Sequence, residues 1–200
     1  MRQNNNFLDV NNDWFFDKYY DKLSFRYWTQ KVALGIFLQI GGDNMVETGC
    51  ARLEEDWGGG MSTYVYGDFA KYYNKHLWTC DIDENCLSMA KTITQEYKDN
   101  ITYVRNDSVK FLEEFDKEIN FLYLDSVDCD PEDDMQTAVS QEHQLREMKV
   151  VLPKLSEKCV VLLDDNNYPN GGKTLLAKRF LEENNFLHIM DFQQSLWIRK

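Results

Sequence analysis

The chain has 200 residues, a length that suits one domain and leaves little room for two. Because 43% of its residues are hydrophobic, it can build a substantial core, and disordered, collagen-like and disulfide-scaffold classes are excluded. Its formal charge of −12 argues against a protein whose main work is to hold a phosphate backbone, so we do not expect nucleic acid as a partner.

The cysteines and the apolar segments indicate the compartment in which the protein works. The five cysteines are odd in number and include no C-x-x-C pair, so neither a zinc site nor a disulfide framework is expected. The polar amino-terminal segment lacks the pattern of a signal peptide, and the longest apolar stretch, residues 32–40, is too short to span a bilayer. We expect a cytoplasmic protein with no membrane partner, and a homodimer remains open.

The predicted elements alternate in a regular order. A helical segment over residues 13–40 carries an aromatic stripe, interpreted as a docking face on the domain, with a substrate-lining lid as the alternative. Strands are then predicted at residues 45–47, 77–82, 101–104, 119–124 and 160–163, and helices at 61–73, 84–98, 108–115, 135–152 and 173–183. Two further strands, at 186–191 and 195–199, close the chain.

This alternation predicts an α/β fold. Nearly continuous apolar strands separated by helices indicate a parallel sheet covered on both faces. The last two strands have no helix between them and should pair antiparallel. The expected architecture is a Rossmann-like, doubly wound, mostly parallel seven-stranded sheet with an antiparallel last strand. We place an N-terminal helical extension at residues 1–43 and the main domain at residues 44–200.

A carboxylate ends, or closely follows, each of the five predicted parallel strands. These acids are Glu47, Asp81, Asp107, Asp125 and the pair Asp164 and Asp165. Ligands bind at the carboxyl ends of the strands in such sheets. Two carboxylates about 7 Å apart repel by roughly 2 to 3 kcal/mol at an effective dielectric near 20. Any single Asp could be a helix N-cap, but the set favours a ligand rich in hydroxyls, amines and positive charge.

The loop after the first strand combines E-x-G at residues 47–49 with three glycines at 58–60. Glycines let a backbone approach a ligand closely, although a flexible turn is the alternative for the triplet. Thr63 stands where the dinucleotide fingerprint needs its third glycine. The G-G-K-T at residues 171–174 is not a phosphate-binding Walker loop, because Asn167 stands at its first glycine position.

Taken in order, these features resemble a class I S-adenosylmethionine-dependent methyltransferase. They are E-x-G after strand one, an acid ending strand two, N-D-S at 106–108, L-D-S at 124–126 and D-D-N at 164–166. The closing antiparallel hairpin agrees with that fold, and the resemblance covers residues 44–200. A departure is the segment between Gly49 and Gly58, which is longer than in typical members.

The resemblance implies S-adenosylmethionine (SAM) as cofactor. Glu47 would lie near its ammonium group, Asp81 would hold the ribose hydroxyls, and Asp107 with Ser108 would contact the adenine. The glycine loop would pass beside the methionine part. The implied cofactor-binding set is Glu47, Gly49, Gly58, Gly59, Gly60, Ser62, Asp81, Asp107, Ser108 and Asp125.

A finer resemblance is to the metal-dependent O-methyltransferases, such as catechol O-methyltransferase and sugar O-methyltransferases. It implies Mg²⁺ held by Asp125, Asp164, Asp165 and Asn166, since hard cations prefer oxygen ligands. The ion would lower the pKa of a substrate hydroxyl and hold the resulting alkoxide in line with the methyl group.

The general base stays open at this stage. The catechol-type lysine, three residues after the first metal acid, is replaced here by Asp128. His143 could serve as a base near neutral pH, or be a partly exposed helix residue. The catalytic candidates are therefore Asp125, His143 and Asp128. The acidic stretch at 129–141 is interpreted as a solvated loop, with extra metal ligands or a substrate cap as alternatives.

The sequence thus predicts a SAM-dependent O-methyltransferase, assisted by magnesium, that acts on a hydroxyl of a small molecule or sugar. The main alternative is a non-catalytic SAM-binding or scaffold protein on the same fold, which would need no metal. A nicotinamide-dependent oxidoreductase is a third hypothesis, against which the missing third glycine counts.

Overall fold

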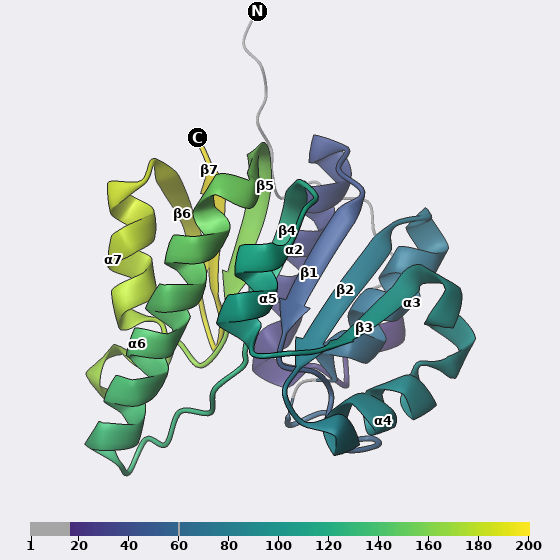
Figure 1. Cartoon of the computed structure of the whole chain (residues 1–200), viewed down its shortest axis with the longest axis horizontal. Helices are drawn as coiled ribbons and strands as arrows, with labels where there is room; N and C mark the ends of the chain where they lie inside the picture. Colours follow the sequence, from purple (N-terminus) through teal and green to yellow (C-terminus); the bar gives the residue numbers. More distant parts are fainter. Residues whose placement is uncertain (1–16, 60) are drawn as a thin grey trace, which may run out of the picture.

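A seven-stranded sheet runs through the molecule and is flanked by helices on both faces (Figure 1). The computed structural model describes residues 17–59 and 61–200. The strand order is β3-β2-β1-β4-β5-β7-β6, and only β7 runs against the others. The strands are β1 (Asn44–Thr48), β2 (His76–Asp81), β3 (Ile101–Arg105), β4 (Ile119–Leu124), β5 (Leu155–Leu163), β6 (Phe186–Asp191) and β7 (Ser195–Arg199).

Two apolar clusters, one on each face of the sheet, form the core. In β4 the alternation is direct: Phe121 and Tyr123 pack in one cluster, whereas Leu122 and Leu124 pack in the other. Helices α2 and α3 cover the first face, and α5, α6 and α7 cover the second. The helical elements are η1 (Ser24–Arg26), α2 (Tyr27–Ile40), α3 (Ser62–Tyr73), α4 (Glu84–Ile93), η2 (Gln95–Asn100), α5 (Ser108–Glu114), α6 (Asp134–Val151), η3 (Leu152–Lys154), η4 (Pro169–Gly171) and α7 (Leu175–Glu183).

The predicted fold class is confirmed, and two helix predictions need correction. The helix expected over residues 13–40 is interrupted, because Ser24 has φ of 47° and α2 begins only at Tyr27; residues 13–16 lie outside the described residues. The helix expected over residues 84–98 ends at Ile93 and continues as the tighter η2. The break falls in a run of β-branched residues, which restrict side-chain freedom in a helix.

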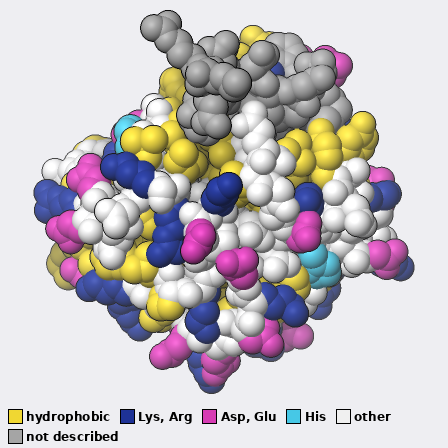
Figure 2. All heavy atoms as spheres, turned by 90° about the horizontal axis from the view of Figure 1, so that it is seen from above, with side chains coloured by type: hydrophobic (Ala, Val, Ile, Leu, Met, Phe, Trp, Pro, Cys, Tyr) yellow, Lys and Arg dark blue, Asp and Glu magenta, His cyan; other side chains and the backbone are white. Residues whose placement is uncertain are grey.

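The topology gathers the loops that follow the parallel strands at one end of the molecule, the lower end in Figure 1. Figure 2 views the opposite end, where lysine and arginine side chains lie among aspartate and glutamate side chains. Such mixing of both charges is typical of a solvated surface. No helix in the described part of the chain has the length and apolar character needed to cross a membrane.

Candidate active site

The turn after β1 brings two strand ends into close contact. Gly49 has φ of 79°, and a Cβ atom there would collide with the carbonyl oxygen of Asp125 at the end of β4. Glycine is therefore required at this position. Further along the same loop, the carbonyl of Gly58 accepts a hydrogen bond of 2.9 Å from Nη1 of Arg26. Gly60, predicted in the same loop, lies outside the described residues.

Asp81, at the end of β2, supports the cavity beside this turn. Its Oδ2 accepts a hydrogen bond of 3.1 Å from the backbone nitrogen of Cys50, and its Oδ1 accepts one of 2.9 Å from that of Asp83. A cavity of about 230 Å³ opens here. Its lining joins loops after β1, β2 and β4, and includes Gly49, Gly59, Ser62, Asp81, Asp125 and Ser126.

Glu47 lies entirely inside the protein at the end of β1. Its Oε2 accepts hydrogen bonds from the hydroxyls of Thr63, at 2.8 Å, and Thr79, at 2.6 Å. Its Oε1 has no hydrogen-bond partner among the described residues. Burial raises the pKa of Glu47 to about 7, although nearby hydroxyls oppose this shift. One oxygen of a buried acid thus remains able to accept a proton or a hydrogen bond.

A second cavity, of about 110 Å³, adjoins the loops after β3 and β4. It is lined by Asp107, Ser108 and His143, and it shares Gly49, Asp81 and Ser126 with the first cavity. Asp107 also caps α5, because its Oδ1 accepts a hydrogen bond of 3.0 Å from the backbone nitrogen of Lys110. A single elongated ligand could therefore contact residues after β1, β2, β3 and β4.

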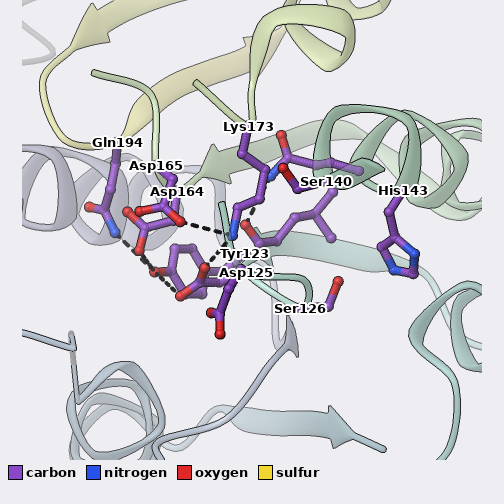
Figure 3. A network of polar contacts seen from close by, with 12 residues as sticks. Tyr123, Asp125, Ser126, Ser140, His143, Asp164, Asp165, Lys173 and Gln194 are labelled. Carbon is purple, nitrogen blue, oxygen red and sulfur yellow. Dashed lines mark hydrogen bonds and ion pairs between the residues drawn. The ribbon is translucent and has the colours of Figure 1, made fainter. Parts of the chain in front are cut away.

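His143 belongs to this second cavity. Its Nε2 lies 2.8 Å from Oγ of Ser108 and 3.7 Å from Oε1 of Glu147, which accepts a hydrogen bond of 2.8 Å from Ser126. Figure 3 shows His143 apart from the cluster of acids that contains Asp125. The structure thus places His143 beside Ser108, a residue that the sequence resemblance assigns to the adenine.

Asp128 lies on the surface in an ion pair. Both of its carboxylate oxygens accept hydrogen bonds of 2.7 Å from the guanidinium of Arg52, and its side chain is 61% exposed. The Arg52 hydrogen bonds hold the pKa of Asp128 below its usual value. In the acidic stretch that follows, Asp133 caps α6 and Asp130 accepts a hydrogen bond from the backbone of Glu132. These acids therefore serve local structure.

The acids after β4 and β5 are joined by a buried lysine (Figure 3). The ammonium of Lys173 lies 2.5 Å from Oδ1 of Asp125 and 3.3 Å from Oδ2 of Asp165, and the lysine side chain is 1% exposed. Asp164 has a separate cation, because Nε of Arg26 donates to its Oδ2 at 3.1 Å. The hydroxyl of Tyr123 donates to the same oxygen at 2.7 Å.

This cluster sets three carboxylates against two cations, and the pKa values reflect the imbalance. Burial raises the pKa of Asp125 well above its ordinary range; the Lys173 ammonium opposes this shift, and the charges of Asp164 and Asp165 add to it. Burial would also raise the pKa of Asp164, but Arg26, Lys173 and the Tyr123 hydroxyl together lower it. Burial and the neighbouring carboxylates thus favour the protonated form of Asp125, whereas the ammonium of Lys173 favours its carboxylate.

The expected magnesium ligands do not fit a magnesium ion. The ammonium of Lys173 holds Asp125 and Asp165, and Arg26 holds Asp164. Oδ1 of Asn166 accepts hydrogen bonds from Thr174, at 2.9 Å, and Lys178, at 3.0 Å. Within residues 17–59 and 61–200, no group of three or more His, Cys, Asp or Glu side chains is arranged to hold a metal ion. The metal site predicted from the sequence therefore finds no support among these residues.

Four site residues have no role in the sequence-based prediction: Arg26, Tyr123, Glu147 and Lys173. A local signal exists for the lysine. Lys173 lies just before α7, where a positive charge opposes the helix dipole. This unfavourable position is offset by the carboxylates of Asp125 and Asp165.

The comparison with known families decides the class of protein. A family described as "Methyltransferase domain" matches residues 57–166, more than half of the chain. The chain belongs to this methyltransferase family. No curated protein matches the chain.

Solved structures of methyltransferases share the fold. The SAH-bound Podospora anserina methyltransferase PaMTH1 has a TM-score of 0.63 at 13% identity, covering 94% of this chain and 84% of that one. CalS11, a TDP-rhamnose 3'-O-methyltransferase of calicheamicin biosynthesis, has a TM-score of 0.61 at 10% identity, covering 96% and 87%. The O-methyltransferase NovP has a TM-score of 0.58 at 13% identity, covering 84% and 76%. The fold is thus that of the class I SAM-dependent methyltransferases.

Proposed function

We propose that this methyltransferase transfers a methyl group from SAM to a hydroxyl oxygen of a small molecule, with sugars as one acceptor class. The observation that carries the proposal is the position of Asp125: this acid lines the same cavity as Gly49 and Asp81, at the carboxyl edge of the sheet. The structurally similar CalS11 and NovP, both O-methyltransferases, support the choice of oxygen as acceptor.

The cofactor would extend across both cavities. Asp107 and Ser108 line the cavity that suits the adenine, and Asp81, which lines both cavities, suits the ribose hydroxyls. Glu47, which the resemblance assigns to the ammonium of the methionine part, is buried at the end of β1 and lines neither cavity. The structure of PaMTH1 with SAH supports a cofactor of this chemistry on the shared fold.

The catalytic task of the chain is to orient the acceptor and take its proton. When bound, SAM supplies a methyl group on a positively charged sulfur. Asp125 would accept the hydroxyl proton as the oxygen bonds to the methyl carbon and the bond from that carbon to sulfur breaks. Magnesium has no part in this proposal, because the carboxylates that would bind it are already paired with Lys173 and Arg26.

The test separates binding from chemistry. SAM affinity is measured by calorimetry, and methyl transfer is measured on a panel of sugars, polyols and catechols. Asp125→Asn should lower turnover by about a hundredfold or more and leave SAM affinity nearly intact. Asp81→Ala should weaken SAM binding by roughly ten- to a hundredfold through the lost charge-assisted hydrogen bonds. Asp130→Asn, in the loop after β4, is the matched control.

Two outcomes would contradict the proposal. SAM binding without transfer to any hydroxyl, together with no effect of Asp125→Asn, would favour the non-catalytic alternative. An Asp125 variant that loses affinity for SAM but keeps its turnover rate would contradict the assignment of Asp125 as proton acceptor.

A further inference from the structure

Lys173 is held in its position by both its backbone and its side chain. Its backbone nitrogen donates a hydrogen bond of 3.0 Å to the carbonyl of Asp165. The preceding residue, Gly172, has φ of 57°, and a Cβ atom there would collide with that same carbonyl. The chain thus bends tightly around Asp165, and this bend directs the lysine side chain inward. The buried ammonium therefore has a fixed place in the fold.

That place is the point where the acids of two neighbouring strand ends meet. The ammonium contacts Oδ1 of Asp125, after β4, and Oδ2 of Asp165, after β5. A divalent ion bound there would need these oxygens at about 2.0 to 2.6 Å. An ammonium already between the two carboxylates excludes such an ion by its volume and by its charge.

We propose that Lys173 is a built-in cation that takes the position of a divalent ion, so that methyl transfer by this protein does not depend on metal. The lysine would hold Oδ1 of Asp125 and thereby orient that carboxylate toward the acceptor. It acts through Asp125 and is a positioning residue. The claim that Lys173 orients Asp125 for methyl transfer rests on the proposed function. The claim that its ammonium replaces a divalent ion can be tested without any turnover.

A corollary makes the proposal testable. Removal of the ammonium leaves two carboxylates side by side in a buried place, and such a pair should bind the cation it then lacks. Lys173→Ala leaves room for an ion with its water, whereas Lys173→Arg keeps the positive charge. Lys178→Ala is the matched control, because Lys178 pairs with Asp191 at 2.6 Å and not with Asp125.

The experiment measures the binding of Mn²⁺ alone to the cofactor-free protein. Electron paramagnetic resonance reports this binding, because the signal of free Mn²⁺ is lost when the ion binds. The wild type, Lys173→Arg and Lys178→Ala should bind Mn²⁺ at least about tenfold more weakly than Lys173→Ala. Adding Asp125→Asn to Lys173→Ala should remove the new site. Circular dichroism verifies that each variant is folded, and Lys173→Gln replaces Lys173→Ala if the latter unfolds.

The outcomes distinguish this inference from the proposed function. Wild-type protein that binds Mn²⁺ as tightly as Lys173→Ala, or a folded Lys173→Ala or Lys173→Gln variant that gains no site, would overturn the inference. Turnover of the wild type that is abolished by EDTA and restored by Mg²⁺ would do the same. A chain that transfers no methyl group to any hydroxyl, but whose Lys173→Ala variant binds Mn²⁺, would contradict the proposed function and leave the built-in cation standing.

Discussion

The ammonium nitrogen of Lys173 and Oδ1 of Asp125 are 2.5 Å apart in the interior of the protein. The lysine side chain is 1% exposed and the aspartate side chain 17%, so water screens this pair little. An ion pair in such a place need not stabilise the fold, but breaking it by removing one partner is costly because a buried charge is left alone.

Lys173→Met should therefore destabilise the protein by about 3 to 5 kcal/mol when measured by urea unfolding in the presence of EDTA. The double variant Lys173→Met with Asp165→Asn should recover part of this loss, because it removes one of the carboxylates left without a cation. A single variant as stable as the wild type would mean that Asp125 and Asp165 do not need the ammonium.

Arg26 and Arg52 both pair with aspartates, but in different surroundings. The side chain of Arg26 is 14% exposed and that of its partner Asp164 is fully buried, whereas Arg52 and Asp128 are 52% and 61% exposed. We expect Arg26→Gln to lower the free energy of unfolding by several kcal/mol, on the order of 3. Arg52→Gln should cost at most about 1 kcal/mol. Equal losses in the two variants, measured by urea unfolding, would contradict this contrast.

Glu47 should make stability depend on pH. Its pKa is raised from 4.5 to about 7 in the folded protein, so the folded state keeps a proton that the unfolded state has lost between these values. Glu47 therefore contributes most to the free energy of unfolding below pH 4.5. This contribution falls as the pH rises from 4.5 to 7, by about 3 kcal/mol in total.

Unfolding by urea between pH 5 and 8 tests this effect, with Glu47→Gln as the comparison. The variant carries no titratable group at this position and should lose less stability over that range than the wild type. Identical pH profiles would show that Glu47 is not the group responsible.

His143 should affect the cofactor more than the chemistry. Its Nε2 is 2.8 Å from Ser108, so His143→Gln should raise the KM for SAM by a larger factor than it lowers kcat. Ser108→Ala should produce a change of the same kind, because it removes the other partner of that contact. A fall in kcat with an unchanged KM, and with the loss of one limb of the pH–rate profile, would instead identify His143 as the general base.

Much of the fold follows from local patterns in the sequence. Apolar runs at the strands and helical periodicity between them are set within a few residues, and the observed strands agree with the predicted ones, although β5 begins earlier, at Leu155. The break near Ser24 is different, because the aromatic stripe continues across it and the left-handed residue is not a glycine.

The candidate site was predictable in its acids but not in their partners. Each acid lies at the end of a strand or just after it, and the topology of a parallel sheet gathers the strand ends. The cations come from elsewhere: Lys173 is 48 positions from Asp125, and Arg26 is 138 positions from Asp164. No periodicity in the sequence relates residues so far apart. Because the sequence does not show which lysines or arginines neutralise the acids, a metal ion is the simplest counter-charge to predict.

Arg26 has a practical consequence for anyone who shortens this chain. Its guanidinium holds the carbonyl of Gly58 and the carboxylate of Asp164 at once, and so ties a segment before the first strand to loops after β1 and β5. A fragment starting at residue 44 would keep all the acids that suggest an enzyme. It would nevertheless lose Arg26, one of the two cations of the acid cluster, and α2, one of the two helices on the first face of the sheet, so a minimal active version must retain the stretch from Ser24 onward.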